Sequence, residues 1–136
     1  MLFRSAKVAI PFAEIQTLME PWRQRFAQMK PSFSEEELYF QFAYWHLLHN
    51  FGHRDAGDRM FMAELQKWID QLASHPDDSE ANKALLAFAW LTNGSWKLHA
   101  YTRDFHALFR DRLGEGHPVT LVTLRSLAYE IGRAHV

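Results

Sequence analysis

The sequence predicts an all-α protein in which antiparallel helix pairs stack as a short α-solenoid of about six helices. The first observation is an internal repeat, because the segment from Pro76 to Trp90 has an upstream copy from Pro31 to Trp45 at an offset of 76 − 31 = 45 residues. A fainter third copy begins at Pro118, at an offset of 118 − 76 = 42 residues. Such a period is typical of helical arrays, whose units bury their apolar faces against one another. The second observation is that no segment shows the sustained two-residue alternation of a β-strand.

Composition and charge restrict the classes of protein and of partner. The 136 residues have the size of one domain, and the 48% that are hydrophobic suffice for a folded core. The 15 basic and 16 acidic residues leave a formal charge of −1, which argues against nucleic acid and against a membrane as partners. The absence of cysteine excludes disulfides and thiolate chemistry. No apolar run reaches the roughly 18–20 residues that span a bilayer, and we expect a cytoplasmic protein.

Both ends of the chain have an unusual property at the level of DNA. Residues 1–5 can be encoded by GTG-CTC-TTC-CGA-TCT, with GTG as the start codon. The reverse complement, AGATCGGAAGAGCAC, lies within codons that can encode residues 130–136. This string resembles a common sequencing-library adapter. We therefore expect residues 1–5 and 130–136 to be adapter-derived, and residues 6–129 to be one helical-repeat domain from a longer protein.

Residues 6–30 are predicted to form a leading helix. Its apolar stripe consists of Ile15, Leu18, Met19, Trp22, Phe26 and Met29. Pro21 lies inside this stripe, where it removes one backbone donor and disfavours helix at the preceding residue. We therefore expect a kink or a break near Pro21.

The first repeat, residues 31–75, contains two predicted helices. Ser34 can cap the first helix, and Glu37 three residues later completes a capping box. Gly52 supplies the left-handed conformation that a helix end favours. The second helix starts near Asp55 or Asp58 and carries the apolar residues Phe61, Leu65, Trp68, Ile69 and Leu72.

The second repeat, residues 76–117, follows the same plan, with Ser79 as the cap of its first helix, Gly94 as the stop and Ser95 as the cap of its partner helix. Residues 118–129 form a truncated third unit that starts near Thr120. Because a repeat without its partner leaves an apolar face uncovered, we expect exposed leucines and self-association at this end. These leucines are Leu121, Leu124 and Leu127.

One junction carries a resemblance to a known family. The segment Leu-Gly-Glu-Gly-His-Pro-Val-Thr at 113–120, followed by Leu-Ala-Tyr at 127–129, resembles the junction between units in kinesin-light-chain-type tetratricopeptide repeats. The second repeat departs from that pattern, since His99 stands where a small residue is expected five places after Gly94. The resemblance implies stacked helix pairs whose concave face holds a peptide or a partner domain. A compact helical bundle with a coincidental repeat is the alternative fold.

In such an array the first helix of each unit lines the concave face. Its polar side chains are our candidates for binding a partner protein or peptide. They are Gln41, His46, Asn50, Asn82, Lys83 and Arg125.

Three histidines form an alternative candidate site. His46, His49 and His53 follow one another at helical spacing, close to Asp58, and could hold zinc or iron. No His-Glu-x-x-His motif is present, and Gly52 is expected to end the helix before His53. The alternative is that His49 packs on Trp45 while the other two imidazoles meet solvent.

The remaining chemistry-bearing residues predict no catalysis. His99 and His106 share a helix face but lack a nucleophile or a second positioned carboxylate. Four tryptophans lie in apolar runs and are expected in the core, and Trp96 is expected to be partly exposed. The four are Trp22, Trp45, Trp68 and Trp90.

The sequence thus predicts a non-enzymatic scaffold that binds a protein or a peptide and needs no cofactor. Two alternatives stay open: a compact helical domain with a histidine-based metal site, and a non-catalytic helical segment of a larger enzyme or signalling protein.

Overall fold

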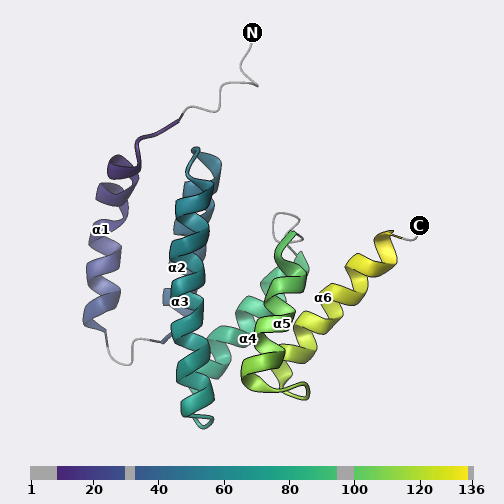
Figure 1. Ribbon diagram of the computed structural model, residues 1–136. Helices are drawn as coiled ribbons and strands as arrows, with labels where there is room; N and C mark the ends of the chain where they lie inside the picture. The colour runs from purple at the N-terminus through teal and green to yellow at the C-terminus, as the bar shows by residue number, and fades with distance from the viewer. Residues whose placement is uncertain (1–8, 30–32, 95–99, 135–136) are drawn as a thin grey trace. The chain divides into compact units, whose positions relative to one another are not determined.

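The computed structural model describes residues 9–29, 33–94 and 100–134, with no side-chain positions at 93–94 and 133–134. Within these ranges the chain forms six α-helices and no strand (Figure 1). The helices are α1 Phe12–Gln28, α2 Glu35–Asn50, α3 Arg54–Ser74, α4 Ser79–Gly94, α5 Thr102–Leu113 and α6 Pro118–Ala134. The predicted all-α class is confirmed, and the stacking of helix pairs as a solenoid remains a prediction.

The chain divides into two compact units, residues 1–66 and 67–136, and α3 contributes to both. We call them the N-terminal unit and the C-terminal unit. None of the helices in the described ranges combines the length and the apolarity that crossing a bilayer requires.

The break predicted at Pro21 does not form, because α1 runs without interruption from Phe12 to Gln28. Apolar side chains on both sides of the proline pack against α2. Ile15 and Met19 are buried in a cluster with Phe40 and Tyr44, and the Phe26 ring lies 5.3 Å from that of Phe40. This tertiary packing outweighs the one backbone hydrogen bond that proline removes.

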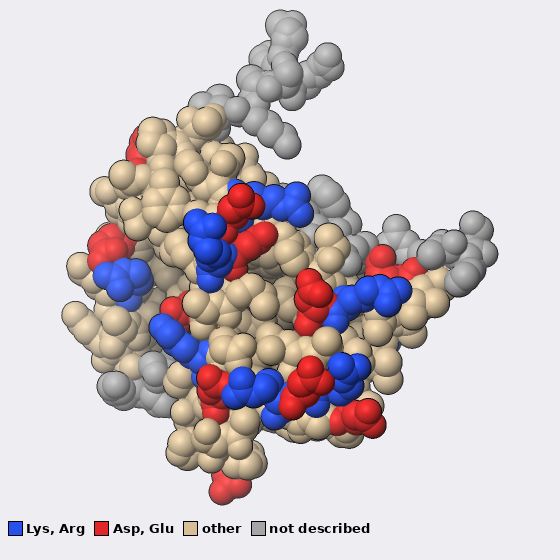
Figure 2. All heavy atoms as spheres, in the orientation of Figure 1, with Lys and Arg blue, Asp and Glu red and all other residues tan. Residues whose placement is uncertain are grey.

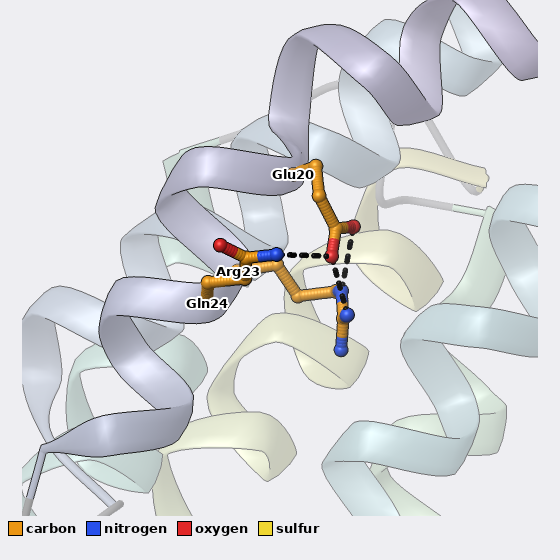
Figure 3. Close-up of polar contacts among 3 residues, drawn as sticks. All are labelled: Glu20, Arg23 and Gln24. Atoms are coloured by element: carbon orange, nitrogen blue, oxygen red, sulfur yellow. Dashed lines mark hydrogen bonds and ion pairs between the residues drawn. The ribbon is translucent and has the colours of Figure 1, made fainter.

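On the exposed side of α1, polar side chains before and after Pro21 interact with one another. The Glu20 carboxylate accepts hydrogen bonds from Arg23 Nε at 2.9 Å and from Gln24 Nε2 at 3.3 Å (Figure 3). The hydrogen bond from Arg23 lowers the pKa of Glu20. Because these side chains are exposed, the ion pair contributes little to stability.

The helix boundaries confirm two predicted signals of the first repeat and correct one of the second. Ser34 Oγ accepts a hydrogen bond from the Glu37 amide at 3.2 Å, and Gly52 follows α2 with φ of 93°. The cap of α4 is Asp78 rather than Ser79, since Asp78 Oδ1 accepts from the Ala81 amide at 3.0 Å. Ser79 is already the first residue of α4, so the preceding Asp78 occupies the cap position. The predicted cap Ser95 lies outside the described residues.

The N-terminal unit has a core of large side chains, in which aromatic rings take the central place. The Trp45 and Phe61 rings stack at 4.6 Å with an interplanar angle of 9°, joining α2 to α3. The two helices approach closely at Gly57, where an added Cβ would lie 3.0 Å from Leu48 Cβ.

The C-terminal unit has a core in which large apolar side chains, among them Trp68, Leu85 and Phe109, are combined with small side chains and hydroxyl groups. Ala81, Ala84 and Ala89 of α4 are fully buried, and the Phe88 ring meets that of Phe105 of α5 at 5.1 Å. Helix α6 packs against both α4 and α5. Its buried face is largely hydroxylic, consisting of Val119, Thr120, Thr123 and Ser126.

Two of the four tryptophans expected in the core are instead exposed. Trp45 and Trp68 are buried, whereas Trp22 is 50% and Trp90 is 49% exposed. The structural offset between α2 and α4 is 79 − 35 = 44 residues, one fewer than the repeat pairing of Trp45 with Trp90. In that register Trp45 corresponds to the buried Ala89, and Trp90 lies about 100° further round the helix.

Candidate partner-binding surface

The three candidate residues of the N-terminal unit lie on α2 but do not form one face. Gln41 is half-buried and lines a shallow depression beside Trp45 and Gly57. His46 is half-buried, with its ring 4.4 Å from that of Phe42, and Asn50 is exposed near the end of the helix. Since Gln41 precedes His46 by five residues, it lies about 140° away round α2.

His49 belongs to a hydrogen-bonded cluster that joins α2 to α3. Its Nε2 lies 2.7 Å from Asp58 Oδ1, and the Trp45 indole N–H donates to the same oxygen at 2.8 Å. The Trp45 and His49 rings meet edge to face at 5.0 Å, which confirms the expected packing of these two residues. The cluster thus provides partners for three polar groups at a helix–helix contact, and its geometry indicates a structural role.

The structure does not bring the three histidines together. His53 Nε2 lies 2.5 Å from the Ile10 carbonyl, to which it can donate, while His46 packs on Phe42 and His49 faces Asp58. In the described part of the chain no group of three metal-binding side chains converges. His46 and His53, which were expected to meet solvent, are both half-buried.

The second histidine pair gives no catalytic arrangement that can be described. His99 lies outside the described residues. His106 Nδ1 is 3.2 Å from Thr123 Oγ1, and that hydroxyl donates to the Thr120 carbonyl at 2.7 Å. The imidazole therefore acts as a donor in the contact between α5 and α6.

The candidates of the C-terminal unit include two exposed cations on neighbouring helices. Lys83 of α4 and Arg125 of α6 are exposed, and Asn82 is half-buried. The Arg125 guanidinium lies over the Trp90 ring, 5.4 Å from its centroid, in a cation–π contact that links the two helices. Trp90 was assigned to the core, yet its spacing of seven residues from Lys83 places both on one face of α4.

Three further apolar side chains extend this surface along α6. Leu121 is 49%, Leu124 is 45% and Tyr129 is 68% exposed. The predicted exposure of Leu121 and Leu124 is confirmed, whereas Leu127 is half-buried. We call the surface formed by Lys83, Trp90, Leu121, Leu124, Arg125 and Tyr129 the α4–α6 face.

The buried side of α6 shows why this face stays outward. Thr92 Oγ1 of α4 and Ser126 Oγ of α6 are 3.1 Å apart and share a hydrogen bond in the core. Thr123, held by His106, fixes the same side of α6 toward α5. Because Thr123 and Ser126 make these hydrogen bonds on the buried side of α6, Leu121 and Leu124 on the other side are directed to solvent.

Comparisons with protein-family models, with curated proteins and with solved structures gave no match to the chain. The surface is therefore interpreted from its own chemistry. On the side of the molecule that Figure 2 shows, described residues of both charge signs are interspersed among uncharged ones.

Proposed function

We propose that this chain is a non-catalytic interaction module of tetratricopeptide-like helix pairs that binds a peptide or another protein. The observation that carries the proposal is the α4–α6 face, where Arg125 lies over an exposed Trp90 beside two exposed leucines. Tryptophan and arginine are the side chains most enriched among the energetically dominant residues of protein interfaces. An exposed apolar patch next to such a pair is typical of a binding surface.

The packing of α6 agrees with this proposal. In a stacked array the first helix of a unit contacts both helices of the preceding unit, and α6 packs against both α4 and α5. In such an array α4 and α6 are the first helices of their units. The α4–α6 face then lies where the resemblance to tetratricopeptide repeats places a bound peptide.

A peptide-display selection on the immobilised full chain tests this function. We expect enriched peptides whose binding falls at least about tenfold when Trp90 is replaced by alanine, which corresponds to the 1–2 kcal/mol typical of an interface tryptophan. The matched control is Trp22→Ala. Trp22 is 50% exposed and lies under Arg25 at 6.0 Å, so it reproduces the pair without the α4–α6 face.

Peptides whose binding is unchanged by Trp90→Ala but is lost with Trp22→Ala would place the binding site on α1 instead. A selection that enriches no peptide with either dependence would overturn the proposed function. Circular dichroism of each variant verifies that the helices are retained.

A further inference from the structure

The exposed side of α6 carries an apolar stripe with the spacing of a helix–helix seam. Leu121, Leu124 and Ala128 are all exposed and follow at intervals of three and four residues. This is the interval at which two helices interlock, whereas an extended peptide offers side chains with a period of two. The stripe covers about 10 Å along the helix axis, or about two turns.

The most exposed charges beside this stripe are basic. Among the described residues of α4 and α6, the exposed charged side chains are Lys83 and Arg125. The acidic residues of these helices, Glu80 and Glu130, are half-buried. A partner that reaches this face from solvent therefore meets two cations first, although the whole chain has a formal charge of −1.

Symmetry argues against a second copy of the chain as the occupant. Two α6 helices in antiparallel contact would pair Leu121 with Ala128, so that the two-fold axis passes between residues 124 and 125. Arg125 lies next to that axis and would meet Arg125 of the other copy. This like-charge contact opposes the dimer and is absent with an acidic partner.

We infer that the α4–α6 face binds an amphipathic α-helix whose apolar stripe is flanked by acidic residues. This inference rests on the proposed function and specifies its partner class. The partner's apolar side chains pack between Leu121, Leu124 and Trp90, and its carboxylates approach Arg125 and Lys83. Arg125 remains over the Trp90 ring and presents its outer N–H groups to the carboxylate.

Three synthetic peptides of about 18 residues, a length near the limit for independent helix formation, test the inference against the full chain. The first has a leucine stripe flanked by glutamates, the second has lysines in place of the glutamates, and the third has the composition of the first with the stripe scrambled. Fluorescence anisotropy measures the dissociation constants, and circular dichroism measures the helix that each peptide gains on binding.

We expect the acidic amphipathic peptide to bind at least about tenfold tighter than the other two at low salt, with a preference over the basic peptide that shrinks at high salt. Arg125→Glu should reverse the order of the acidic and basic peptides. Trp22→Ala should leave all three affinities unchanged.

Equal binding of the scrambled peptide would overturn the helical geometry, and equal binding of the basic peptide would overturn the acidic partner. Sedimentation that shows a dimer abolished by Leu124→Glu would assign the face to a second copy. Binding to anionic vesicles that depends on Arg125, without peptide binding, would assign it to a lipid surface. If display-selected peptides need Trp90 while the acidic helix fails, only this inference fails and the proposed function stands.

Discussion

The two units of the chain pack their helices in different ways. In the N-terminal unit the contact between α2 and α3 consists of large rings, with Trp45 stacked on Phe61 and tied to Asp58 by its indole N–H. In the C-terminal unit α4 and α6 share a buried hydrogen bond between two hydroxyl groups, those of Thr92 and Ser126. The first contact joins two stacked rings, and the second joins two small hydroxyl side chains.

This difference has a consequence for the surface. The buried side chains of α6 are those of valine, threonine and serine, whereas Leu121 and Leu124 are exposed and available to a partner. In the N-terminal unit the large apolar residues of α2 are used mainly inside, at Phe40, Tyr44 and Leu48.

The largest expected effect is a difference in stability between alanine variants of two tryptophans that occupy similar positions in the repeat. Trp45→Ala should lower the free energy of unfolding by about 3–5 kcal/mol, because it leaves a cavity beside Phe61 and removes a donor from Asp58. Trp90→Ala should change it by less than about 0.5 kcal/mol, since half of that ring is already exposed. Urea unfolding followed by circular dichroism measures both. Equal losses would show that the two rings have the same structural role.

A substitution of intermediate effect tests the small-residue packing of the C-terminal unit. Ala84 is fully buried in α4, and Ala84→Leu should cost about 1–3 kcal/mol because the added atoms force neighbouring helices apart. The control is Ala43→Leu on α2, where the side chain is exposed and leucine is a good helix former. The same unfolding measurement applies, and a tolerated Ala84→Leu would contradict close packing at this position.

The smallest expected effect concerns the cap of α4. Asp78→Ala should cost about 1 kcal/mol, since the Ala81 amide loses its acceptor. The neighbouring Asp77→Ala, at an exposed position before the cap, should cost clearly less.

The same cap has a pH dependence with a defined sign. The hydrogen bond from the Ala81 amide, followed by that from Gln71, lowers the pKa of Asp78 below its ordinary value. A carboxyl whose pKa is lower in the folded state stabilises the fold above its unfolded pKa and loses that contribution as the pH falls through the folded pKa. The difference in stability between the chain and its Asp78→Ala variant should therefore be constant near neutral pH and shrink below about pH 4. A difference that persists unchanged at pH 2 would rule out capping by the ionised carboxylate.

Local signals in the sequence sufficed for the helical class and for several helix ends. Ser34 and Gly52 act where capping chemistry predicts, because a cap depends on residues within a few positions of one another. The break predicted at Pro21 does not form, because contacts with α2, which is distant in sequence, keep α1 continuous. The exposure of Leu121 and Leu124 agrees with the prediction made from the repeat pattern.

Local patterns predict the set of helices and their amphipathic character, since spacing, caps and glycine stops act over one or two turns. Which side of each helix is buried depends on the tertiary packing. A register of 44 rather than 45 residues separates the buried Trp45 from the exposed Trp90. A shift of one residue rotates a side chain by about 100° round a helix, so the burial of a single tryptophan depends on packing that no local pattern encodes.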